Sequence, residues 1–158
     1  MKLSKKIVYL LAFLIFIGSL GLFTLSADAS EIVPATNKVP FEERYYQLFD
    51  VGLTWDEARV HAQSLGGDLV AIRNVATQSF IEKLVQRGNK TEYWLGGYHI
   101  ATSGANQFRW VTGESMNFTN WWPNEPNNLY YGNGLWENRI VMSANYGRWN
   151  DISHMGLC

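Results

Sequence analysis

The chain has 158 residues, of which 47% are hydrophobic and 15% aromatic, and its formal net charge is −1. This length and apolar content suit one compact domain with a buried core and exclude a largely disordered chain. The nearly neutral charge, with no basic cluster beyond the first six residues, argues against nucleic acid as a partner.

The first 29 residues differ in composition from the rest. Three lysines precede an apolar run over 7–25, and Ala27-Asp28-Ala29 is the small-x-small pattern that signal peptidase accepts. We predict a signal peptide over 1–29, cleavage after Ala29, and a secreted or cell-surface, extracytoplasmic protein. The alternative is an uncleaved membrane anchor, because the apolar run approaches the thickness of a bilayer. Only in that case would the chain contact a membrane.

Residues 30–44 contain Pro34 and Pro40 among mixed polar residues and are interpreted as an N-terminal tether. The folded domain is expected over 45–158, beginning with a short strand at 45–49.

A first helix is predicted after Thr54. Thr54 has the character of an N-cap, and Glu57 stands three residues later at the capping-box position. The helix is expected to end at Gly66-Gly67. Apolar spacings of 3, 4 and 3 predict one buried face, made of Trp55, Ala58, Ala62 and Leu65.

An apolar strand is predicted at 69–72, followed by a second helix. This helix is expected from Asn74 or Thr77 to Arg87, with Gly88 as its stop signal. Its inward face is expected to be Phe80, Ile81, Leu84 and Val85.

From residue 93 onward the pattern indicates short strands between loops rich in glycine and asparagine. Strands are predicted at 93–95, 108–111 and 138–142, and about 25 residues separate the last two. A loop of that length is uncommon in a compact domain unless it has a function.

The long loop and the segments after it are rich in oxygen donors. Glu125, Glu137 and Asp151 supply three carboxylates, and Asn127 and Asn150 supply two amides. Calcium takes about six to eight oxygen ligands of these kinds, whereas zinc prefers imidazole or thiolate. The alternative from chemistry alone is that these side chains are solvated and form caps and turns.

The order of short motifs is more specific than their chemistry. The motifs are Trp55-Asp56-Glu57-Ala58, Gly66-Gly67-Asp68-Leu69, Trp94-Leu95-Gly96-Gly97, Phe108-Arg109-Trp110-Val111-Thr112-Gly113, Phe118-Thr119-Asn120-Trp121, Glu125-Pro126-Asn127 and Trp149-Asn150-Asp151. In this order the chain resembles the C-type lectin-like family across roughly residues 45 to 153. The Glu-Pro-Asn and Trp-Asn-Asp motifs resemble the mannose-type members.

The resemblance implies an α+β domain with two helices, small mixed or antiparallel sheets and a long calcium-binding loop region. It implies a cis peptide bond before Pro126 that directs the oxygens of Glu125 and Asn127 toward one point. By the same resemblance the cofactor is Ca²⁺. Its expected protein ligands are Glu125, Asn127, Glu137, Asn150 and Asp151.

The resemblance also implies a function, which is carbohydrate binding through the ion, with glycans or glycoproteins as partners. Two neighbouring sugar hydroxyls bind calcium while carboxylates accept and amides donate hydrogen bonds to them. The expected sugar-binding residues are Glu125, Asn127, Glu137, Asn150, Tyr131 and Trp122. Glu-Pro-Asn favours mannose, glucose or N-acetylglucosamine over galactose. The aromatic loop over 128–136 resembles galactose-type relatives, in which a ring packs on the sugar, so Tyr130, Tyr131 or Trp136 is the expected stacking residue unless the ring packs on the core.

Departures from the family pattern are also visible. Ala62, Arg139 and His154 stand where disulfide-bearing members have cysteine, so this is a disulfide-free variant. The sequence ends seven residues after Asp151, and we expect the family's final strand to be missing. Cys158 has no partner in its own chain; it is a free thiol, an intermolecular bridge that would make an oligomer, or only the point where the sequence ends, and we favour the last.

The same residues also suggest two other functions. Glu125 and Glu137, or Glu137 and Asp151, resemble the carboxylate pair of a glycosidase, but a bound calcium ion would keep all of them ionised, so we expect no enzyme. The stronger alternative is a protein-interaction or adhesion domain that uses the same fold without sugar. A complete set of five oxygen ligands argues against that alternative.

Overall fold

The computed structural model describes residues 38–100 and 108–158 of the chain. The predicted signal peptide and the first part of the predicted tether lie outside the described residues. Over the two ranges that are described, no helix is long and apolar enough to cross a membrane. The elements in these ranges are β1 (Lys38–Phe41), β2 (Arg44–Gln47), α1 (Trp55–Ser64), α2 (Val75–Val85), β3 (Glu92–His99), β4 (Phe108–Trp110), β5 (Tyr130–Gly132), β6 (Leu135–Ser143) and β7 (Trp149–Ser153).

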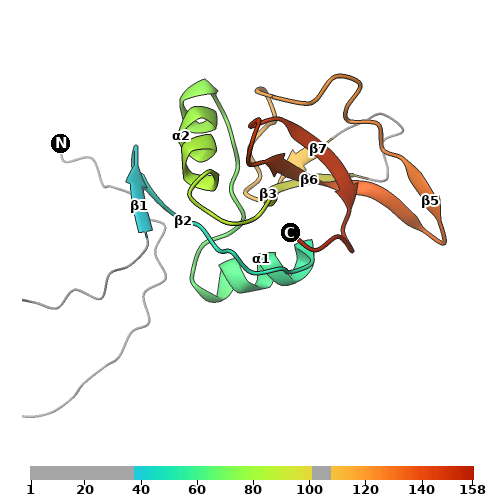
Figure 1. The fold of residues 1–158 in the computed structure, drawn as a ribbon, viewed down its shortest axis with the longest axis horizontal. Coiled ribbons are helices and arrows are strands. Elements are labelled where there is room, and N and C mark those ends of the chain that lie inside the picture. The colour runs from blue at the N-terminus through green and yellow to red at the C-terminus, as the bar shows by residue number, and fades with distance from the viewer. Residues whose placement is uncertain (1–37, 101–107) are drawn as a thin grey trace, which may run out of the picture.

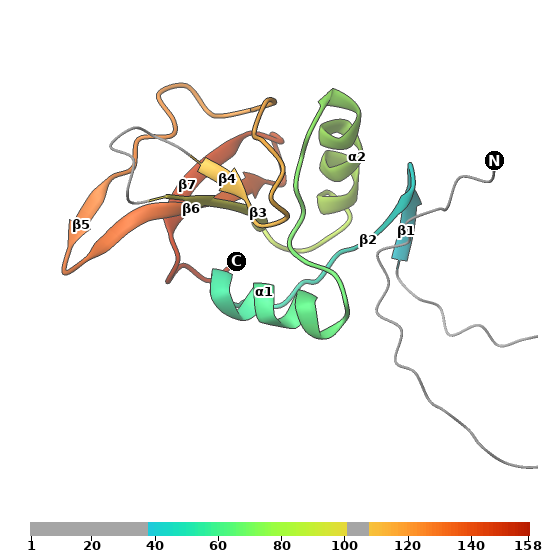
Figure 2. The ribbon, with the colours of Figure 1, turned by 180° about the vertical axis from the view of Figure 1, so that it is seen from behind.

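The strands form two sheets. β1 and β2 make a small hairpin, and the main sheet has the order β4-β3-β6-β5, with β7 also paired to β6. Every named strand pair is antiparallel, and a parallel bridge joins Trp121 to Trp149. The β5–β6 hairpin extends from the end of the sheet farthest from β1, and the C-terminus lies beside α1 (Figures 1 and 2). The α+β fold class predicted from the motifs is confirmed.

The domain begins earlier than the sequence indicated. β1 lies inside the segment assigned to a tether, and β2 begins at Arg44 instead of Tyr45. The reason is a turn at Glu42, whose φ is 52°, which pairs the two strands directly. The Phe41 ring then stacks on Phe80 of α2 at a centroid distance of 4.3 Å, which ties the hairpin to the core.

Helix α1 follows the capping signals closely. Glu57 Oε2 accepts a hydrogen bond from the Thr54 N–H at 2.9 Å, and the Thr54 hydroxyl accepts from the Glu57 N–H at 3.4 Å. Gly66 takes the left-handed conformation that ends the helix, with φ 78°. The predicted inward position of Leu65 is wrong: this residue is the C-cap and is 37% exposed. Trp55 is the buried residue of α1, whereas Ala58 and Ala62, the smaller residues on the same face, are half-buried.

The predicted strand at 69–72 is also wrong. This segment has no regular secondary structure, although Ala71 and Ile72 are buried. It is attached to the main sheet by a hydrogen bond from the Gly96 N–H to the Val70 carbonyl at 2.8 Å. The segment crosses close to β3 because residue 96 has no side chain: a Cβ there would lie 2.7 Å from the Leu69 oxygen. Burial without a neighbouring strand accounts for the strand-like apolar pattern.

Helix α2 begins at the cap residue Asn74, whose Oδ1 accepts from the Thr77 N–H at 2.7 Å. Three of the four predicted inward residues are buried, and Phe80 is half-buried against β1 and β2. Gln78 is also buried on this face. Its amide donates to the Gly147 carbonyl at 2.7 Å and accepts from the Trp149 indole at 2.9 Å, which fixes the start of β7.

The core is built around aromatic residues. Trp110 and Trp149 are 1% and 0% exposed and contact each other edge to face at 5.6 Å. Trp121 packs against the cluster of Trp110 and Trp149, and Trp94 is buried in a second cluster with Trp55. Tryptophan thus holds β7 against the long loop.

The C-terminal residues return to the segment before α1. The Leu53 N–H donates to the Cys158 carbonyl at 3.1 Å, and the Cys158 N–H donates to the Leu53 carbonyl at 3.2 Å. Within the described ranges no strand follows β7, and Cys158 is a free cysteine. At one of the positions where relatives have cysteine, the Arg139 guanidinium instead lies 4.4 Å from the Trp55 ring centroid.

Candidate functional site

The loop between β4 and β5 contains the cis peptide bond expected from the resemblance, between Glu125 and Pro126. Asn124 and Asn128 on either side have φ angles of 72° and 50°, in the left-handed region that asparagine tolerates. The Asn127 N–H donates to Glu125 Oε2 at 3.0 Å. Glu125 and Asn127 therefore lie side by side in one tight segment.

Asp151 joins this loop to strand β7. Its side chain is fully buried, and its two oxygens accept hydrogen bonds from the backbone N–H groups of Asn127 at 3.1 Å and Asn128 at 2.8 Å. Asn127 Oδ1 in turn accepts from the Leu129 N–H at 2.8 Å. The loop is therefore held in place through the carboxylate that the sequence predicted as a calcium ligand.

Glu137 arrives from strand β6 and is 5% exposed. Its backbone N–H donates to the Leu129 carbonyl at 2.9 Å, so the base of the β5–β6 hairpin is attached to the same loop. Its Oε1 accepts a hydrogen bond from the Tyr131 hydroxyl at 2.5 Å, and its Oε2 is buried without a partner. Asn150 lies beside Asp151 on β7, and its Oδ1 is also buried without a partner.

Three carboxylates, those of Glu125, Glu137 and Asp151, influence one another and the nearby Tyr131 hydroxyl. Burial raises the pKa of Asp151 to about 6, and a hydrogen bond to Glu125 also raises it, against the lowering effect of the Asn127 and Asn128 N–H groups. The hydrogen bond to Glu137 raises the pKa of the Tyr131 hydroxyl, and the charges of Asp151 and Glu125 add to that effect. The field at Tyr131 thus comes from all three acidic residues.

The donor set fits a hard divalent cation. Among residues 38–100 and 108–158, no three His, Cys, Asp or Glu side chains are clustered tightly enough to hold a metal on their own. The amide oxygens of Asn127 and Asn150 would complete the set, since calcium accepts amide and carboxylate oxygens alike. The orphaned Glu137 Oε2 and Asn150 Oδ1 are the strongest sign, because buried oxygens without partners are costly unless something binds them.

The aromatic candidates lie in different directions. The hydroxyl of Tyr131 reaches Glu137, whereas Tyr130 and Trp136 lean on each other at a centroid distance of 4.4 Å. Trp122 contacts Tyr146 edge to face at 5.2 Å, and its carbonyl accepts from the Glu125 N–H at 3.1 Å. The Trp122 ring therefore packs beside the loop, and its predicted contact with sugar stays a prediction.

Two residues that support the site were not among the predicted site residues. Gln78 accepts a hydrogen bond from the indole of Trp149, the residue that precedes Asn150 and Asp151 in the chain. The Asn128 N–H is one of the two backbone donors to the Asp151 carboxylate. Asn128 directly follows the Glu-Pro-Asn motif, and this position was the signal in the sequence that could have identified it as part of the site. Nothing in the sequence distinguished Gln78 from a solvated helix residue.

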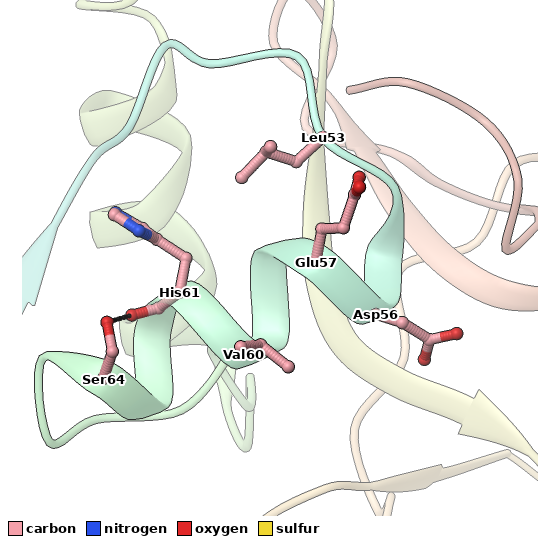
Figure 3. A pocket seen from close by; sticks show the side chains of 6 residues that line it. All are labelled: Leu53, Asp56, Glu57, Val60, His61 and Ser64. Atoms are coloured by element: carbon pink, nitrogen blue, oxygen red, sulfur yellow. Dashed lines mark hydrogen bonds between the residues drawn. The ribbon is translucent and has the colours of Figure 1, made fainter.

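A separate pocket of about 480 Å³ lies along α1 and the segment before it (Figure 3). Its lining residues are Leu53, Asp56, Glu57, Val60, His61 and Ser64. The Glu57 carboxylate is bound in the helix cap, and none of these residues belongs to the loop site.

The fold is that of a small C-type lectin-like domain. The family model described as the lectin C-type domain matches residues 51–154. The chain belongs to this C-type lectin domain family, which is a family of non-enzymatic domains.

Similar proteins support the same family. Human C-type lectin domain family 17, member A is 32% identical over 126 residues, which cover 80% of this chain and 31% of that protein. Human C-type mannose receptor 2 is 33% identical over 112 residues, which cover 71% of this chain and 7% of the receptor. The chain thus spans less than a third of the length of these two relatives.

Solved structures agree in fold. The carbohydrate-recognition domain of cow CD23, determined in the presence of a GlcNAc2Man3 oligosaccharide, is 29% identical with a TM-score of 0.65, and the match covers 77% of this chain and 86% of that one. The C-type lectin CEL-I from Cucumaria echinata is 22% identical with a TM-score of 0.68, covering 78% and 91% of the two chains. The CEL-I likeness concerns the fold alone.

Proposed function

We propose that this domain binds carbohydrate in a calcium-dependent manner at the loop site. The observation that carries the proposal is the pair of buried oxygens without partners, Glu137 Oε2 and Asn150 Oδ1, beside the fully buried Asp151. Family membership and the oligosaccharide present with cow CD23 support the same function. The residues that would hold the ion are Glu125, Asn127, Glu137, Asn150 and Asp151.

A bound calcium ion supplies open coordination positions for two neighbouring sugar hydroxyls. The protein residues supply the directional contacts: the Glu125 and Glu137 carboxylates accept from hydroxyl groups, and the Asn127 and Asn150 amides donate to hydroxyl oxygens. Asp151 keeps the loop in place through the Asn127 and Asn128 N–H groups. The order of acceptor and donor at the site then distinguishes hydroxyl stereochemistry.

The favoured ligands are mannose, glucose and N-acetylglucosamine, and the physiological partners are glycans or glycoproteins. Glu125 presents an acceptor and Asn127 a donor in the order that resembles mannose-type lectins. This order decides which hydroxyl pair binds at all, whereas stacking on an aromatic ring contributes about 0.5 to 1.5 kcal/mol. The coordinating residues are therefore weighted above the aromatic loop. Export with cleavage after Ala29 is part of the proposal, because glycans of this kind are displayed outside the cell membrane.

The test is retention of the exported protein on immobilised mannose and on immobilised galactose, with calcium and with chelator. We expect retention on mannose with calcium and release by chelator. Glu137→Ala should abolish retention, whereas Glu43→Ala, which removes an exposed carboxylate in the β1–β2 turn, should leave it unchanged. Exchanging Glu125 for Gln and Asn127 for Asp should shift retention toward galactose.

Two results would overturn parts of the proposal. Calcium-dependent retention of the wild type on galactose alone refutes the mannose-type assignment. Absence of retention on every sugar of a glycan array, in a protein that still binds calcium, refutes carbohydrate binding and favours the alternative of a protein-interaction or adhesion domain.

A further inference from the structure

The two oxygens of Glu137 have different environments. Oε2 is buried without a partner, and Oε1 accepts the hydroxyl of Tyr131 at 2.5 Å. If an ion is bound among the carboxylates, the free Oε2 is the oxygen of Glu137 that remains available to it. Oε1 is then the oxygen left to receive a hydrogen bond from a ligand hydroxyl.

We propose that the Tyr131 hydroxyl occupies the place of a sugar hydroxyl on Glu137, and that a glycan must displace it to bind. This inference rests on the proposed function of the loop site. The hydrogen bond from a phenol to a carboxylate is of the same kind as that from a sugar hydroxyl, so the two donors compete for one acceptor. Tyr131 is thus a specificity-determining residue through its hydroxyl, which differs from the ring-stacking role expected from the sequence.

Displacement requires that Tyr131 can leave without disturbing the fold. Its side chain is 60% exposed, and it lies in β5, a strand of three residues at the edge of the sheet. Among the described residues its ring has no aromatic neighbour, whereas Tyr130 packs on Trp136. Rotation of the Tyr131 side chain therefore breaks its hydrogen bond to Glu137 but removes few packing contacts.

Glu137, by contrast, cannot move away. It is 5% exposed and belongs to the nine-residue strand β6, and its N–H is bound to the Leu129 carbonyl. The acceptor is buried in a long strand, whereas the competing donor is an exposed side chain on a short edge strand, so a ligand can displace the donor without moving the acceptor.

The test compares Tyr131→Phe with the matched control Tyr130→Phe. Tyr130 is the neighbouring phenol, and its hydroxyl accepts from the Gly134 N–H at 3.2 Å and has no bond to Glu137. Calorimetric titration with methyl mannoside at saturating calcium should give a dissociation constant about 10-fold lower for Tyr131→Phe than for the wild type, which corresponds to about 1.4 kcal/mol. Tyr130→Phe should differ from the wild type by less than about 2-fold.

A second measurement reports on displacement directly. Addition of methyl mannoside to the calcium-loaded wild type should change the tyrosine absorption spectrum, because the phenol of Tyr131 loses its carboxylate partner, and this change should be absent in Tyr131→Phe. Equal or weaker binding of the sugar by Tyr131→Phe overturns the inference and leaves calcium-dependent sugar binding in place. No sugar binding by either protein, with calcium binding retained, refutes the proposed function and the inference with it.

Discussion

Replacement of Gln78 tests how the helical layer supports the loop site. Gln78 is 4% exposed and makes two hydrogen bonds to the start of the β7 region, to the Gly147 carbonyl and from the Trp149 indole. Gln78→Met conserves the volume and removes these two bonds, together with the bond that the Gln78 amide donates to Glu82 Oε1 at 2.8 Å, so it separates the polar contribution from the cost of a cavity.

The magnitude follows from which groups lose their partners. The Gly147 carbonyl still accepts from the Asn120 amide at 2.9 Å, but the Trp149 indole N–H is left buried without an acceptor. One orphaned buried donor costs about 1 to 3 kcal/mol, and the lost bond at Gly147 adds about 1 kcal/mol. We therefore expect a loss of about 2 to 4 kcal/mol, or a decrease in melting temperature of about 10 °C for a domain of this size.

The assay is urea unfolding followed by tryptophan fluorescence, in chelator and in calcium. The control is Gln86→Ala, because Gln86 is exposed at the end of α2 and should change stability by less than about 0.5 kcal/mol. Because Trp149 directly precedes Asn150 and Asp151, Gln78→Met should also weaken calcium binding. A midpoint for Gln78→Met that equals the wild-type midpoint would refute the reasoning that this glutamine anchors the site.

Three further predictions concern calcium, acid and the single cysteine. Calcium at about 100 times its dissociation constant should stabilise the fold by about 2.7 kcal/mol. A melting temperature that does not change on addition of millimolar calcium would contradict the proposed calcium site. Hydrogen bonds from Tyr93 and Asn89 lower the pKa of Asp50, so its stabilising effect is present above the unfolded pKa and is lost as the pH falls through the lower folded value. Asp50→Asn should therefore flatten the acid limb of the stability profile below about pH 4, and an unchanged acid limb would contradict this role. Burial raises the pKa of the Cys158 thiol to about 12, so alkylation at pH 8 should be much slower in the folded protein than in urea, and a covalent dimer on non-reducing electrophoresis would show that the thiol is accessible.

Local chemistry made much of the fold predictable from the sequence. The caps at Thr54 and Asn74 start helices because a short polar side chain satisfies the free N–H groups of the first turn, whatever the rest of the chain does. The family motifs placed the cis bond before Pro126 in the correct segment. The five oxygen donors were predicted as calcium ligands from the family resemblance, in agreement with the preference of calcium for carboxylate and amide oxygens, and their role stays a prediction.

Features that depend on neighbours distant in sequence were not predictable. The strand β5 was missed although Asn133-Gly134 is a strong hairpin turn signal, because the surrounding loop suggested no regular structure. The segment 69–72 has the apolar pattern of a strand but has no strand beside it. The apolar pattern of 69–72 predicts burial, and only the packed structure shows whether a neighbouring strand supplies the hydrogen bonds.

The residue types of the site were therefore determined by the sequence itself, and their relations were decided by the tertiary structure. Tyr131 shows the difference: the aromatic loop indicated a ring for stacking, whereas an irregular register between Tyr130 and Gly132 in the β5–β6 pair accompanies the bond from the Tyr131 hydroxyl to Glu137. A shift of one residue in a strand reverses the face on which a side chain lies, and register depends on contacts across the whole sheet. The sequence contains both Glu137, the acceptor, and Tyr131, the donor, but the pairing of β5 with β6 in the folded sheet is what brings them into contact.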